Sequence, residues 1–214
     1  MILRGPMHWK PQAEVEAAGF AFRRSVSFNE DDDKLSCSST STWNPLDPGA
    51  FGFSCWARAP VGAFNNNDFL WYASSSGDAS HFGFSLSGTD AVLMGKTRNV
   101  SFTGTHVISS ATQAAWNMYS MVSYTSGRGA QIVLLYINGV QVDSFSLSNN
   151  TFTHSTVDLK IGGLFLGYIC EMVFCNYQIT APQLVALYNS GNGADPTTVL
   201  DSVHSYYPVS EAAG

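Results

Sequence analysis

The sequence predicts an all-β protein, a sandwich or barrel of short strands with one short helix near the C-terminal end. Three observations lead to this prediction. Ten or more stretches of alternating apolar and polar residues follow one another along the 214-residue chain, with turn residues between them. Serine and threonine are abundant and there are 19 glycines, as in proteins whose strands are joined by tight turns. One segment, 179–192, has the apolar spacing of a helix instead.

Strand signals begin after the first 21 residues. In 50–59, alternation places Phe51, Phe53, Cys55 and Ala57 on one face of a strand. The other strand-like stretches are 23–28, 33–38, 68–74, 81–87, 91–96, 100–104, 106–110, 117–124, 131–139, 140–147, 157–163 and 167–177. We expect residues 1–21 to form an arm, because they hold two prolines and show no clear period. Residues 192–214 form a tail with a further strand-like patch.

An Asn-Gly pair separates two apolar runs at Asn138 and Gly139. Both central residues of a type I′ turn need positive φ angles, which Asn and Gly tolerate best. The sequence therefore predicts a hairpin in which 132–137 pairs with 140–145.

The helix signal begins at Thr180, a residue type that caps helix N-termini, and Pro182 suits the first turn. Its apolar face consists of Leu184, Leu187 and Tyr188. We expect Gly191 to end the helix.

Composition excludes several classes of function. The net charge is −6 and no basic run is present, so we expect no nucleic-acid binding. No stretch of 18 consecutive apolar residues occurs, so we expect no membrane insertion. The first residues also lack the apolar stretch of a signal peptide, and no phosphate-binding glycine loop or nucleophile motif is present.

The four cysteines are expected to be small core residues, with a bridge between distant strands as the alternative. Cys170 and Cys175 share one strand-like stretch, and their separation of five positions places them on opposite faces, too far apart to bridge. The disulfide state of Cys37, Cys55, Cys170 and Cys175 stays open.

In their order and spacing, these segments resemble the laminin-G-like, concanavalin A-like lectin/glucanase superfamily. The motifs that carry the resemblance are "VSFNEDDDKLSC", "FGFSCWARAP", "AAWNMYSMVSY", "LLYINGVQV" and "LKIGGLFLGYICEMVFCNYQITAPQLVALYNSG", which together cover roughly 23–191. The resemblance implies a jelly-roll sandwich of two antiparallel sheets, with one short C-terminal helix. We therefore divide the chain into an arm (1–21), the sandwich (22–191) and a tail (192–214), and we expect Trp56 and Trp116 to be buried between the sheets.

Glycosidases of this superfamily carry two carboxylates, two to four residues apart on one strand, so that one can attack while the other donates a proton. Glu171 is the one glutamate in a confidently predicted strand. Positions 169, 173 and 175 hold Ile, Val and Cys, so no partner carboxylate is available. We expect no enzymatic activity.

Sugar binding needs aromatic rings for stacking and polar groups for hydrogen bonds. Candidates in loops or at strand ends are Trp43, Phe64, Asn67, Trp71 and Tyr72, for which packing in the core or an interface is the alternative.

Calcium binding needs hard oxygen ligands. Candidates are Asn29, Asp31, Asp32, Asp33 and Asp68, for which ordinary polar turns are the alternative. No other cofactor is predicted.

The tail, "LYNSGNGADPTTVLDSVHSYYPVSE", resembles the linker that follows such domains in structural proteins of phages and environmental viruses. The resemblance implies a virion protein with a lectin-like domain, acting in assembly, surface decoration or host-glycan attachment. Its partners would be copies of itself and other virion proteins. The alternative is a free carbohydrate-binding or adhesion module at the cell surface or outside the cell. We expect the arm and the tail to pack on a neighbouring copy, or alternatively to fold back on their own domain.

Overall fold

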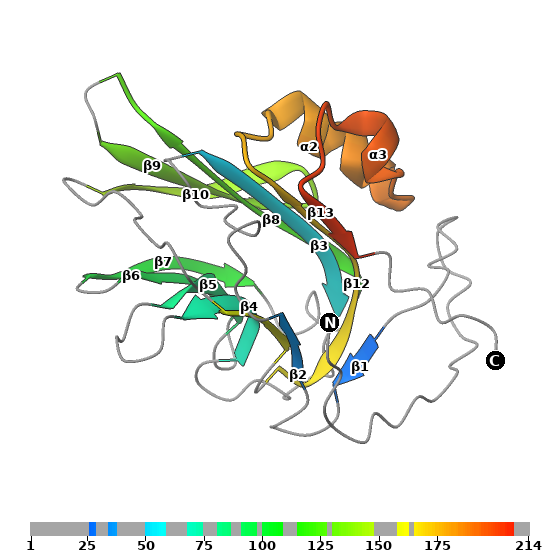
Figure 1. Ribbon diagram of the computed structural model, residues 1–214, viewed down its shortest axis with the longest axis horizontal. Coiled ribbons are helices and arrows are strands. Elements are labelled where there is room, and N and C mark those ends of the chain that lie inside the picture. The colour runs from blue at the N-terminus through cyan, green and yellow to red at the C-terminus, as the bar shows by residue number, and fades with distance from the viewer. Residues whose placement is uncertain are drawn as a thin grey trace.

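The computed structural model describes residues 26–28, 34–37, 50–58, 68–74, 81–86, 91–97, 100–108, 115–127, 130–147, 158–162 and 165–207. In this part, every strand pairing is antiparallel and the helices are short. The predicted all-β class is therefore confirmed. Figure 1 shows helices α2 and α3 on one side of the largest sheet and the smaller sheets on its other side.

The largest sheet has seven strands. Its order is β1 (Val26–Phe28), β12 (Gly167–Cys175), β3 (Phe51–Arg58), β8 (Asn117–Thr125), β9 (Gln131–Ile137) and β10 (Val140–Leu147), and β13 (Ser205–Tyr207) also pairs with β12. Because β3 occupies one edge of β12, β1 and β13 share the other. β1 pairs with 167–169 and β13 with 172–174.

Two smaller sheets complete the described strands. The four-stranded sheet has the order β2 (Lys34–Cys37), β11 (Asp158–Gly162), β4 (Asp68–Ser74) and β5 (His81–Leu86), and the two-stranded sheet joins β6 (Ala91–Thr97) to β7 (Val100–Ile108). Strand β7 combines the two stretches that the sequence predicts separately at 100–104 and 106–110.

The inner face of the seven-stranded sheet is apolar and buried. Phe51, Phe53, Cys55 and Ala57 share this face, as alternation predicts, and all four are fully buried. The pairing register adds Met121 and Phe174, which both lie beside Phe53. The rings of Phe53 and Phe174 are 5.0 Å apart.

The opposite face, here called the helix face, holds the cluster that packs against α2 (Ala181–Tyr188). Trp56 lies in this cluster with 4% of its surface exposed, and its ring stacks on that of Tyr188 at 5.7 Å. The expectation that Trp56 is buried is correct, but it lies between the sheet and the helices rather than between sheets. Alternation is the reason, because Cys55 and Ala57 take the inner face.

Trp116 also departs from the prediction. It is partly buried at the rim of the helix-face cluster, immediately before β8 begins.

Helix α2 begins as predicted, since the Thr180 hydroxyl accepts a hydrogen bond from Gln183 N and the Gln183 side chain accepts one from Thr180 N. It ends differently. Asn189, rather than Gly191, adopts the left-handed conformation after the last helical residue and starts the short 3-10 turn η1 (Asn189–Gly191). Among the described residues, no helix has the length and apolarity needed to cross a membrane.

The tail contains a second helix, α3 (Pro196–Val199), that the sequence analysis did not predict. Asp195 caps it through a hydrogen bond from Thr197 N of 2.8 Å. Leu200 then enters the helix-face cluster, and β13 joins the sheet. As far as Tyr207 the tail thus folds back on its own domain, which was the alternative expectation, and packing on a neighbouring copy stays a prediction. Residues 1–21 lie outside the described part.

A β-bulge in β12 overturns the prediction for two cysteines. Glu171 has a φ of 49°, and the pairing with β3 shifts register between Cys170 and Val173. The extra residue changes the phase of alternation, so Cys170 and Cys175 both lie in the helix-face cluster. Cys170, Cys175 and Cys55 are buried free thiols, as expected of core residues.

Candidate functional site

The predicted sugar-binding residues are not assembled into one site by the described residues. Trp43, Phe64 and Asn67 lie outside them. Trp71 and Tyr72 lie in the middle of β4, beside Ile161 and Lys160 of β11, rather than in a loop or at a strand end. Strand β4 is itself interior, between β11 and β5.

The predicted calcium ligands are equally untested. Asn29, Asp31, Asp32 and Asp33 fall between β1 and β2, outside the described residues, and Asp68 is the first residue of β4. No group of three His, Cys, Asp or Glu side chains that could hold a metal occurs in the part of the chain that the structure describes. Calcium binding stays a prediction.

A different group of side chains meets where β3 ends and β8 and β12 begin. Arg58 pairs with Tyr168 across β3 and β12, and Trp116 immediately precedes the residue that pairs with Ala57. The Arg58 guanidinium carbon lies 4.6 Å from the centre of the Tyr168 ring and 5.4 Å from that of Trp116. These are cation–π distances. We call Arg58, Trp116 and Tyr168 the Arg58 cluster.

Close approach of the backbones makes the Arg58 cluster possible. Gly167 begins β12, and a Cβ atom there would lie 2.4 Å from the carbonyl oxygen of Arg58. A larger residue would push β3 and β12 apart, so the glycine allows the Tyr168 ring to contact the guanidinium.

The hairpin turn holds the segment that carries Trp116 of the Arg58 cluster. Asn138 and Gly139 have φ angles of 53° and 77°, as a type I′ turn requires, which confirms the prediction. The Asn138 carboxamide accepts a hydrogen bond from Met118 N at 2.8 Å and donates one to Asn117 Oδ1 at 2.9 Å. Asn117 in turn donates to Ala115 O at 3.1 Å, so the backbone on both sides of Trp116 is held in place.

Charge and burial distinguish Arg58 from an ordinary surface arginine. All three residues of the Arg58 cluster are partly buried. Arg58 Nε is buried and has no hydrogen-bond partner. Within the described residues Arg58 makes no ion pair, so its interactions there are with aromatic rings. A guanidinium in this state can still donate hydrogen bonds in its own plane to an incoming acceptor.

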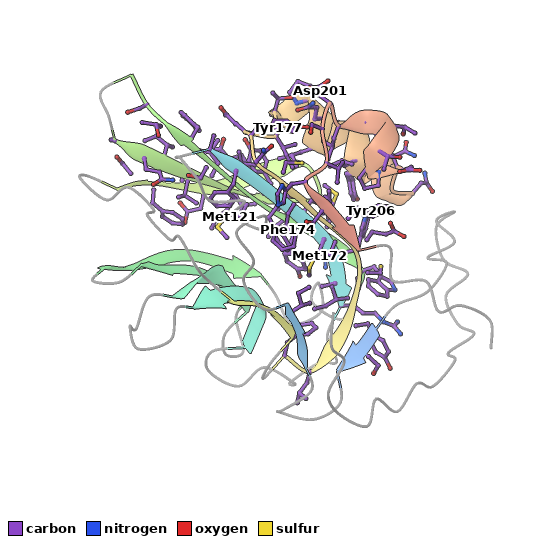
Figure 2. The ribbon with its side chains drawn as sticks, in the orientation of Figure 1. Met121, Met172, Phe174, Tyr177, Asp201 and Tyr206 are labelled. Carbon is purple, nitrogen blue, oxygen red and sulfur yellow. The ribbon has the colours of Figure 1, made fainter. Side chains whose placement is uncertain are left out.

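Glu171 is used structurally. The Tyr206 hydroxyl donates a hydrogen bond to Glu171 Oε2, which links β13 to the bulge of β12 (Figure 2 labels Tyr206). Burial raises the pKa of Tyr206 well above its usual range, and the Glu171 carboxylate adds to that effect. The rest of β12 carries no second carboxylate, so the strand lacks the spacing of a glycosidase pair.

Neither Arg58 nor Tyr168 is marked by a local sequence pattern, and Trp116 was expected in the core. Alternation from Trp56 does place Arg58 on the same face of β3. Its two aromatic neighbours, however, come from segments far away in the sequence, and only the pairing register brings them together.

Comparison with solved structures finds other all-β domains. Domain 4 of AbnA, a GH43 extracellular arabinanase from Geobacillus stearothermophilus solved in complex with arabinotriose, aligns over 75% of this chain and 74% of its own, with a TM-score of 0.58 and 15% identity. The native heptameric SAP-like pentraxin from Limulus polyphemus aligns over 78% of this chain and 86% of its own, with a TM-score of 0.51 and 13% identity.

A third structure, the receptor-binding domain of botulinum neurotoxin type G, aligns over 66% of this chain, with a TM-score of 0.51 and 14% identity. The chain spans only 38% of that domain's length. No family model and no curated protein matches the chain. At these identities the likeness shows the fold alone, an all-β, jelly-roll-like architecture consistent with the expected concanavalin A-like class.

Proposed function

We propose that this chain is a non-enzymatic, lectin-like module that binds a carbohydrate. The observation that carries the proposal is the likeness to domain 4 of AbnA, because that domain was solved with arabinotriose and the alignment covers about three quarters of both chains. In this proposal the four-stranded and two-stranded sheets together form the second layer of a two-sheet sandwich, which packs on the inner face of the seven-stranded sheet.

The absence of catalysis is part of the proposal. Glu171 is the strongest candidate in the sequence for a catalytic carboxylate, and it accepts a hydrogen bond from Tyr206 of β13. Retaining glycosidases hold two carboxyl groups about 5 Å apart, and inverting ones about 6.5–9.5 Å apart. No such partner exists on β12. Glu171→Gln should therefore leave carbohydrate binding unchanged.

A glycan array probed with the labelled full chain tests the proposal, followed by thermal unfolding with each sugar that binds and with arabinotriose. A ligand at about 100 times its Kd stabilises the folded state by about 2.7 kcal/mol. In a domain of this size that raises Tm by about 5–10 °C. An array with no reproducible signal, together with an unchanged Tm, would show that the module does not bind carbohydrate.

The setting of the module is a second part of the proposal. We place it in a virion, as an oligomeric protein of assembly, surface decoration or host attachment, on the resemblance of its tail to viral structural proteins. The pentraxin that shares this fold is a heptamer, which supports the capacity of such domains to assemble. Native mass spectrometry tests the oligomer, and electron microscopy of particles labelled with an antibody to the chain tests the virion. A monomer that is absent from particles would favour a free carbohydrate-binding or adhesion module.

A further inference from the structure

We propose that the Arg58 cluster binds the carboxylate of an acidic sugar, a uronate or a sialate, while its aromatic rings contact the sugar ring. This inference rests on the proposed carbohydrate-binding function and specifies its ligand. It depends on three properties of Arg58: its contacts with two aromatic rings, the state of its donors and the lack of an ion pair with any described residue.

The guanidinium lies against two aromatic rings of the protein. The rings of Trp116 and Tyr168 lie 6.5 Å apart with an interplanar angle of 58°, and the guanidinium carbon is within 5.4 Å of both. These contacts limit the orientations open to the guanidinium and use none of its N–H donors, which lie in its plane. The group is therefore oriented in advance for an acceptor in its plane.

The N–H donors of the Arg58 guanidinium indicate which kind of acceptor would bind there. Arg58 Nε is buried without a hydrogen-bond partner, which is a costly state for a charged group. The fork of two parallel N–H groups in arginine matches the two oxygens of a carboxylate. Nε is closed to a ligand by its burial, but the two terminal amino groups of the guanidinium are not among the buried unpartnered atoms. No described carboxylate forms an ion pair with Arg58, so a carboxylate carried by the ligand would pair with these two terminal groups.

The aromatic rings favour a sugar over a simple carboxylate ion. Trp116 and Tyr168 are each only partly buried. Aromatic rings offer apolar surface to the C–H groups of a sugar ring, and Trp and Tyr combine that surface with a polar group.

The experiment compares acids with their own neutral esters. The probes are 3′-sialyllactose and trigalacturonate, each beside its methyl ester, which keeps the rings and removes the charge. Binding to the full chain is measured by titration calorimetry. We expect the wild-type protein to bind at least one of the two acids about tenfold or more tightly than its ester, as the loss of a charge-assisted hydrogen bond implies.

Three variants locate the effect. Arg58→Gln should weaken binding of the acid about tenfold or more and leave binding of the ester unchanged. Arg58→Lys keeps the charge but loses the planar fork, and it should also weaken binding. Lys96→Gln is the matched control, because it removes one positive charge from β6 in a different sheet, and it should bind like the wild type. Thermal unfolding of each variant reports whether it is folded.

The outcomes separate this inference from the proposed function. Equal affinity for acid and ester in the wild-type protein would overturn the inference, and this comparison does not depend on any variant folding. A folded Arg58→Gln protein that binds the acid normally would overturn it too. If only neutral glycans on the array bind, the inference fails and the proposed function stands. If no glycan binds, both fail.

Discussion

Gly52 is the position at which a single added methyl group should be most informative about the helix face. It lies in β3 opposite Cys175, where the segment leading to α2 crosses the sheet. A Cβ atom at Gly52 would lie 2.2 Å from Cγ1 and 2.6 Å from Cδ1 of Ile179. Carbon atoms in contact are normally about 3.5–4.0 Å apart, so Gly52→Ala cannot be accommodated unless Ile179 moves by more than about 1 Å.

Ile179 has little freedom to move, because only 1% of its surface is exposed and it packs within the helix-face cluster. Overpacking of this kind typically costs about 1–3 kcal/mol. For a domain of this size that lowers Tm by about 2–12 °C. The measurement is urea denaturation, followed by both circular dichroism and tryptophan fluorescence so that two-state behaviour is checked.

A double-mutant cycle isolates the cause. Ile179→Ala alone should cost about 2–5 kcal/mol, since it leaves a cavity. The double variant Gly52→Ala/Ile179→Ala should cost less than the sum of the two by about 1–3 kcal/mol, because the new methyl group fills space that the isoleucine has left. Gly127→Ala is the control: a Cβ there meets no atom within 4 Å, so its effect should stay within about 1 kcal/mol and can be stabilising. A Gly52→Ala protein as stable as the wild type, or costs that simply add, would refute this account of the packing.

Three further predictions concern the hairpin, the tail and the buried thiols. Asn138→Ala should cost about 2–3 kcal/mol in urea denaturation and Asn138→Gly less, because glycine keeps the positive φ; the reverse order would contradict the turn assignment. Tyr206→Phe removes the donor to Glu171 and should cost about 1–3 kcal/mol, and an unchanged stability would mean that this bond does not hold β13. Burial raises the pKa of Cys175 from 9.0 to about 11, so the unfolded chain loses that proton first; stability should therefore fall as pH rises from 9 to 11, and less steeply in Cys175→Ala, whereas identical slopes would contradict the burial.

Local patterns in the sequence were enough to predict much of the fold. The Asn138–Gly139 turn, the Thr180 cap and the alternation in 50–59 each depend on residues that are close in sequence, and each is confirmed. The short helix α3 also has a local signal, Asp195 followed by Pro196, which matches an N-cap and first-turn proline. The resemblance of the tail to a linker predicts an irregular segment there instead.

The features that were not predicted depend on register. No propensity marks Glu171 for a left-handed conformation, so the bulge and the common face of Cys170 and Cys175 could not be derived from spacing. The Arg58 cluster joins residues from three separate segments of the chain. Strand pairing over such separations follows from the topology of the whole domain, which local sequence patterns do not specify.

The way β12 is bordered has a consequence for how the domain reaches its native state. Its neighbours β1 and β13 come from opposite ends of the described chain, whereas β8, β9 and β10 pair with their sequence neighbours. Contacts of high sequence separation require large loops to close and make folding slow. The β8–β10 meander can form early, whereas pairing of β1 with β12 joins Val26 to the distant Ile169. Until β13 pairs with β12, the outer edge of β12 is open at 172–174. During that interval, and in any chain cut before residue 205, the backbone of 172–174 is available to pair with a strand from another molecule.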